Sequence, residues 1–153
     1  MTAHAAALVD VCEWAAACRG RTGDLLAGLG HAPDLLRTDP GTAAHVLDAR
    51  LAQEIPALLD RDEWVELHTL LVACLAEFLI SAHGARWAWC EDSGSPVGGR
   101  WVITRFTHPL GGRTSAVDVG ALAGDALASA PAVSLTALID RAELAAGLRP
   151  VRG

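Results

Sequence analysis

WVELHTLLVACLAEFLISAHGARWAWC, residues 64–90, joins a long apolar segment to a tryptophan-rich one. Its apolar residues recur with a period of 3.6 before Gly84 and with a period of 2 after it, which predicts a helix followed by a strand. The residues before this stretch are mostly helical in pattern, whereas the β signal follows it. We therefore expect the rest of the fold to be organised around residues 64–90.

The predicted central helix has clear start and stop signals and covers about residues 62–83. Asp60 and Glu63 have the spacing of a capping box, and Gly84 is placed for a left-handed C-cap. The most apolar part, residues 67–80, contains His68 and Glu77 and is shorter than the roughly 20 apolar residues that span a bilayer. We expect a buried core helix and no contact with a membrane.

The residues before the central helix predict further helices. Residues 2–19 have an amphipathic pattern, which we expect Gly20 and Gly23 to end. Asp39 followed by Pro40 combines an N-cap with a proline at the first helical position, so a second helix should begin there. The amino-terminal half is therefore predicted to be helical.

Residues 85–91 and 100–106 predict a β-hairpin around the turn sequence DSGSPVGG. Pairing Trp89 with Trp101 gives a register in which four apolar side chains share one face: Trp87, Trp89, Trp101 and Ile103. We expect the central helix to cover this face. The other face is mixed, and we expect it to meet solvent or a partner.

The carboxyl-terminal part predicts a third strand over residues 115–119 and two helices, over residues 121–129 and, after a capping Ser134, to about residue 148. The expected fold is α+β, with the central helix packed on a small three-stranded antiparallel sheet. At 153 residues the chain has the length of one domain, so we expect residues 1–153 to form a single domain.

The charge and the amino-acid composition bear on nucleic-acid binding and on the kind of genome that encodes the chain. The net charge is −6, and residues 1–63 carry ten acidic residues against five arginines, which argues against nucleic-acid binding. The chain has no Lys, Asn or Tyr, residue types with A/T-rich codons, so we infer a GC-rich bacterial genome. In such a genome arginine is the ordinary cation, and its twelve copies need no special function.

The compartment is predicted from the amino terminus and the cysteines. The opening residues lack a basic region, and Asp10 and Glu13 interrupt the apolar run of a signal peptide. The four cysteines form no CxxC pair, which favours reduced, structural thiols. We expect a cytoplasmic protein.

Glu77 is the polar residue of most interest. Glu66 and Glu77 fall near one helix face and could both be solvated, but Glu77 also interrupts LLVACLAEFLI and could be buried and paired with Arg86 or Arg105. The sequence leaves both possibilities open. No catalytic or metal-binding motif is present, so we predict no cofactor and no metal site. If the protein is an enzyme, its reactive residues are Glu77, Cys90 and His108.

The hairpin supplies the predicted contact surface, made of aromatic and cationic side chains: Trp87, Trp89, Trp101, Arg86, Arg100 and Arg105. The tryptophans could bind a ligand or partner, or fill the core as the main aromatic side chains available. The arginines could form an anion site or be ordinary surface charges. These alternatives remain open at the level of sequence.

These observations lead to three functional hypotheses. The first is a non-enzymatic cytoplasmic binding or accessory protein, such as an immunity-type protein or a pathway partner, that contacts another protein through the hairpin and the acidic helical half. The second is a small enzyme or small-molecule-binding domain with a pocket between the central helix and the hairpin. The third is a homodimer that packs through small residues such as Ala73 and Ala76.

Overall fold

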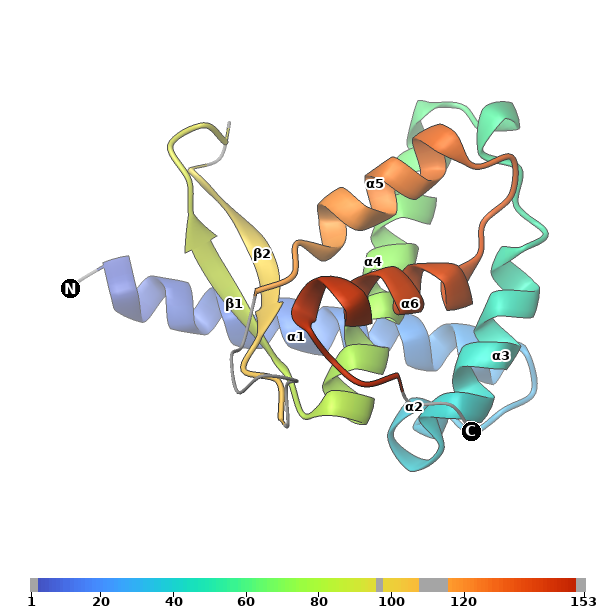
Figure 1. Cartoon of the computed structure of the whole chain (residues 1–153), viewed down its shortest axis with the longest axis horizontal. Coiled ribbons are helices and arrows are strands. Elements are labelled where there is room, and N and C mark those ends of the chain that lie inside the picture. The colour runs from blue at the N-terminus through green and yellow to red at the C-terminus, as the bar shows by residue number, and fades with distance from the viewer. Residues whose placement is uncertain (1–2, 96–97, 108–115, 151–153) are drawn as a thin grey trace.

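The computed structural model describes residues 3–95, 98–107 and 116–150, with side chains from residue 11 onward. These parts contain six α-helices, a 3₁₀ turn and a two-stranded antiparallel sheet (Figure 1). The elements, in chain order, are α1 (Ala3–Gly28), α2 (Leu35–Thr38), α3 (Pro40–Leu51), η1 (Pro56–Leu58), α4 (Arg61–His83), β1 (Arg86–Glu91), β2 (Gly99–Thr104), α5 (Val119–Ser129) and α6 (Leu135–Ala146). The mixed helix-and-sheet class is confirmed.

The predicted central helix is α4, and its ends are confirmed. Asp60 and Glu63 form a reciprocal capping box with N–O distances of 2.9 and 3.0 Å. Gly84 ends the helix in the left-handed conformation with φ of 65°, where a side chain would be strained. An added Cβ there would also come within 2.9 Å of Thr107 Cγ2.

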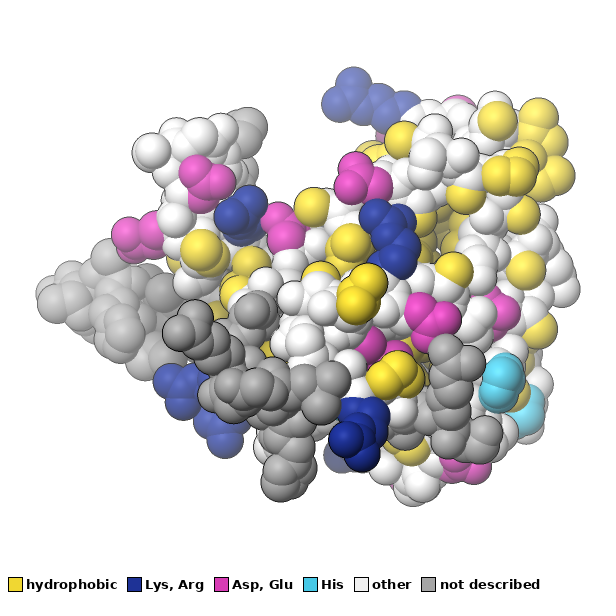
Figure 2. All heavy atoms as spheres, viewed as in Figure 1, with side chains coloured by type: hydrophobic (Ala, Val, Ile, Leu, Met, Phe, Trp, Pro, Cys, Tyr) yellow, Lys and Arg dark blue, Asp and Glu magenta, His cyan; other side chains and the backbone are white. Residues whose placement is uncertain are grey.

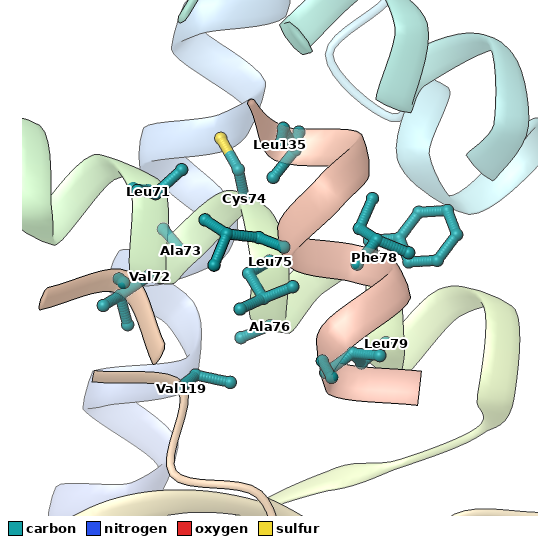
Figure 3. Close-up of a cluster of buried hydrophobic side chains, with 14 of the residues drawn as sticks. Leu71, Val72, Ala73, Cys74, Leu75, Ala76, Phe78, Leu79, Val119 and Leu135 are labelled. Atoms are coloured by element: carbon teal, nitrogen blue, oxygen red, sulfur yellow. The ribbon is translucent and has the colours of Figure 1, made fainter. Parts of the chain in front are cut away.

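The middle of α4 lies in the core, where it packs with residues of other helices such as Val119 and Leu135 (Figure 3). By length and hydropathy α4 could cross a membrane, but 56% of its most apolar window is buried inside the fold. Ala73 and Ala76 are fully buried within the protein. They cannot form a dimer face, so that part of the homodimer hypothesis is wrong.

The first helix is longer than predicted. α1 continues through Gly20 and Gly23 to Gly28, although glycine lowers helix stability by about 1 kcal/mol relative to alanine. Tertiary packing overrides this local preference, because Leu26 is fully buried and Gly23 lies against Pro33, whose carbonyl oxygen would be 3.4 Å from an added Cβ. The prediction that the helix ends at these glycines is wrong.

The predicted starts of helices α3 and α6 are confirmed. The structure also shows a contact between these two helices that was not predicted. Asp39 caps α3 by accepting a hydrogen bond from Thr42 N at 3.2 Å, and Ser134 caps α6. Asp48 of α3 also accepts a hydrogen bond from Leu135 N at 2.7 Å. A side chain far away in sequence thus satisfies one of the free amides at the start of α6.

The hairpin register is confirmed, since Trp89 pairs with Trp101 and Trp87 with Ile103. The third strand is not confirmed. Val117 forms an isolated antiparallel bridge with Ile103, with N–O distances of 2.9 and 2.8 Å, and Val119 already belongs to α5. Ser115, where that strand was expected to begin, lies outside the described residues.

The tryptophan face of the hairpin packs against α1, a contact that was not predicted, while β2 also contacts α4 and Trp87 and Ile103 join the core around that helix. Trp14 of α1 is stacked on Trp101 with ring centroids 5.4 Å apart and meets Trp87 edge to face at 5.5 Å. Trp89 contacts Trp101 edge to face at 5.0 Å. Such aromatic pairs contribute about 0.5–1.5 kcal/mol each beyond their area burial. This tryptophan cluster therefore joins the hairpin to α1.

Candidate functional site

Glu77 is buried, with 5% of its surface exposed. No hydrogen bond or ion pair joins its carboxyl group to any other residue that the structure describes. Burial raises the pKa of Glu77 from 4.5 to about 7, while the positive charges of Arg19 and Arg37 partly oppose this rise. The carboxyl group is therefore both largely desolvated and close to half-protonated at neutral pH.

Two hollows lie beside Glu77, with volumes of about 290 and 310 Å³. Arg19, Arg37 and Glu77 line both of them, so residues from α1, α2 and α4 meet at one place. The larger hollow also contains Ser81, whose Oγ is buried without a hydrogen-bond partner. Buried polar groups of this kind are uncommon in proteins and mark sites that a bound group can complete.

The partners predicted for Glu77 are wrong. Arg19 and Arg37 approach it, whereas Arg86 and Arg105 are exposed on or next to the hairpin. No hairpin residue lines either hollow, so the predicted pocket between the central helix and the hairpin does not form around Glu77. The solvated alternative holds for Glu66, which is exposed, but not for Glu77.

The hairpin residues predicted as a contact surface serve different purposes. Trp87 is buried, and Trp89 and Trp101 are half-buried in the tryptophan cluster, which favours the core-packing alternative. Arg100 lies 3.4 Å from Asp118 and 3.9 Å from Asp92, a structural role at the start of α5. Arg105 has a φ of 60°, an uncommon conformation for a residue with a side chain. The structure does not bring the three arginines together with the tryptophans as one site.

The residues considered for catalysis do not form a cluster in the described part of the chain. Cys90 is half-buried on β1, and the hollows beside Glu77 do not include it. His108 lies outside the described residues. Cys18 and Cys74 are buried, and burial raises the pKa of each thiol to about 12, so both are inert at neutral pH. Among the residues with described placement, no group of three or more His, Cys, Asp or Glu could hold a metal ion.

A separate groove of about 590 Å³ lies along the acidic helical half, between α1, α3 and α4. Its apolar lining is Leu59, Leu67 and Leu70. Four acidic residues and two arginines complete it: Asp24, Glu54, Glu63, Glu66, Arg21 and Arg50. We call this lining the acidic groove. It has an apolar base and a net negative rim, which is the chemistry of a site for an apolar group with cationic neighbours.

Exposed apolar side chains continue from the acidic groove. Leu58 is 76% exposed, and Ile55 and Val65 are about half exposed, at 47% and 49%. Figure 2 shows hydrophobic side chains gathered at the upper right, over the region of η1 and the start of α4. Large apolar side chains grouped on a surface and rimmed by polar residues are typical of protein contact sites.

Several of these residues could not be identified from the sequence. Arg19 and Arg37 are 58 and 40 positions away from Glu77 in the chain, and no motif relates them. The only available signal was the isolated charge of Glu77 within an apolar run. Comparisons with models of protein families, with curated proteins and with solved structures found no match to this chain.

Proposed function

We propose that this chain is a non-enzymatic, cytoplasmic accessory protein that acts by binding another protein. The docking site is the acidic groove together with the exposed turn that contains Ile55 and Leu58. The observation that carries the proposal is Leu58, a leucine that is 76% exposed beside a groove with a leucine base. Exposing so much apolar surface is unfavourable in water, and a partner that covers it would remove this penalty.

The charge of the site indicates the kind of partner. Between residues 54 and 66 the chain carries five acidic residues and one arginine. A second copy of the chain would bring these acidic side chains against each other if it docked through the same surface. The partner we propose therefore presents an apolar side chain flanked by Lys or Arg, so that opposite charges face each other across the contact.

A photo-cross-linker identifies the partner in the producing cell. The probe is a benzophenone side chain at position 58, and the matched control is the same side chain at Leu144, which is 83% exposed on α6. We expect a cross-linked protein from position 58 that position 144 does not give. Identical products from the two positions would contradict the proposed site.

Binding to the purified partner then tests the chemistry of the contact. We expect Leu58→Asp to weaken binding at least tenfold, which corresponds to about 1.4 kcal/mol, and added salt to weaken it further. The control variant Leu144→Asp should bind as the wild type does. Equal affinities for the wild type and Leu58→Asp would overturn the proposal.

The second candidate function is binding of a small molecule. It is favoured by the buried carboxyl of Glu77 beside two hollows, in a different place from the predicted pocket. The lining of the two hollows includes no cysteine or histidine beside Glu77. Ligand binding therefore fits the lining residues better than catalysis by Glu77, Cys90 and His108 does. The ligand that such a site would take can be inferred from its charges.

A further inference from the structure

The larger hollow beside Glu77 has a lining dominated by hydrogen-bond donors. It is lined by Arg19, Arg37, Ser81 and Glu77, with Ala15 and Ile80 as apolar walls. Guanidinium groups only donate hydrogen bonds, and a hydroxyl group can donate one. A protonated Glu77 would add a further donor. The four polar groups together can therefore surround an acceptor.

The net charge of this lining favours an anion over a cation. Two arginines outweigh one carboxyl group even when Glu77 is ionised, and Glu77 is the one acidic residue in the lining of the larger hollow. The smaller hollow differs, because Asp24 and Asp34 line it and would repel a negative group. A bound anion would thus lie on the Ser81 side.

The site also has groups that lack partners. Glu77 has 5% of its surface exposed, and its carboxyl group has no hydrogen bond to a described residue. Ser81 Oγ is fully buried and has no hydrogen-bond partner in the part of the chain that the structure describes. Leaving such a group unsatisfied costs about 1–3 kcal/mol. A ligand oxygen that accepts from Ser81 and Glu77 would offset this cost.

We propose that the hollow bounded by Arg19, Arg37, Glu77 and Ser81 binds a small anion, a carboxylate or phosphate group, and that Glu77 takes up a proton when the anion binds. This anion site is independent of the acidic groove, with which it shares none of these four residues. The arginines would supply paired donors that match the oxygens of either anion.

The proton uptake follows from the groups around Glu77. The guanidinium groups of Arg19 and Arg37 stay charged at all pH values of interest. The two nearby thiols, of Cys18 on α1 and Cys74 on α4, stay neutral because burial raises the pKa of each to about 12. Glu77 is thus the group of this set that titrates near neutrality, with a pKa of about 7. A bound negative charge raises its proton affinity further. By linkage, anion affinity falls as the pH rises above about 7.

The test is a nuclear magnetic resonance titration of the full chain with acetate and, separately, with sulfate, at constant ionic strength. Acetate represents the carboxylate class and sulfate the phosphate class, and both keep their charge between pH 6 and pH 8. We expect saturable shifts of the Glu77 and Ser81 signals with at least one anion at pH 6, and at least tenfold weaker binding at pH 8. Shifts that do not saturate with either anion would overturn the proposal.

Variants separate the site from general surface attraction. Arg37→Gln should weaken anion binding at least tenfold, whereas Arg141→Gln, which removes another exposed charge, from α6, should leave it unchanged. Glu77→Gln should keep binding but remove its pH dependence. The anion site would be contradicted if Arg37→Gln and Arg141→Gln lost the same anion affinity. It would also be contradicted if the pH dependence of binding persisted in Glu77→Gln.

Discussion

His83 Nε2 lies 2.7 Å from Glu143 Oε2, and both side chains are buried, with 6% and 2% of their surface exposed. The contact joins the carboxyl end of α4 to the last turn of α6. The backbone carbonyl of His83 also accepts hydrogen bonds from the amide and the hydroxyl of Thr107, at 2.8 and 2.7 Å. His83 thus connects the central helix to α6 and to the segment after β2.

We expect Glu143→Ala to destabilise the protein by about 3 kcal/mol. The substitution leaves the buried His83 ring without this hydrogen-bond partner, which costs about 1–3 kcal/mol, and it opens a cavity that adds to the loss. The control is Asp140→Ala, an exposed acid one turn earlier on α6, which should change stability by less than about 0.5 kcal/mol. Urea unfolding of both variants decides the matter. Equal stabilities would show that the pair contributes nothing.

Alanine at two glycines should have opposite effects on stability. Gly20 is exposed inside α1, with nothing within 4 Å of an added Cβ, so Gly20→Ala should stabilise the protein by about 0.5–1 kcal/mol. At Gly99 the Cβ would lie 2.5 Å from the Trp89 ring and 2.7 Å from Cys90 O, so Gly99→Ala should destabilise it by about 1–3 kcal/mol. Thermal unfolding measures both. A destabilising Gly20→Ala would mean that α1 is not continuous.

The structural features that were predicted correctly from the sequence depend on residues close together in the chain. The capping residues of α3, α4 and α6 each act within three positions of the helix start, and the hairpin register follows from the alternation of adjacent residues. The failures involve contacts between distant segments. Trp14 meets residues 87 and 101, His83 meets Glu143, and Arg19 lies near Glu77, and periodicity carries no information about such pairs.

Trp14→Ala should release the hairpin from α1. Trp14 contacts both Trp87 and Trp101, so we expect a loss of about 3 kcal/mol in unfolding free energy and a weaker near-ultraviolet circular dichroism signal from the tryptophan cluster. Trp64 provides a matched control, because it stacks on His68 with centroids 5.2 Å apart, away from the cluster. Trp64→Ala should leave the signal of the tryptophan cluster in place.

The stability of the protein should depend on the ionisation of Glu77. Burial raises its pKa in the folded state to about 7 from 4.5, so the folded state binds the proton more tightly than the unfolded state does. The contribution to stability is complete below about pH 4.5 and is lost as the pH rises through about 7. Taking about 1.4 kcal/mol per pKa unit, about 3–4 kcal/mol is lost across this window.

Glu77→Gln should therefore remove most of the change in stability between pH 5 and pH 8, and it should be more stable than the wild type at pH 8. Glu66→Gln provides the control, since Glu66 is exposed on the same helix and its replacement should preserve the wild-type dependence. Urea unfolding at the two pH values gives the comparison. A pH dependence that is the same in both variants would assign the effect to other groups.

The most direct measurement is the pH titration of the Glu77 side-chain carboxyl carbon by nuclear magnetic resonance. A buried carboxyl group beside the hollows that Arg19 and Arg37 line should titrate with a midpoint near 7. A midpoint near 4.5, the ordinary value for glutamate, would show that the fold does not raise the pKa of Glu77 and would contradict the proton uptake proposed for the anion site.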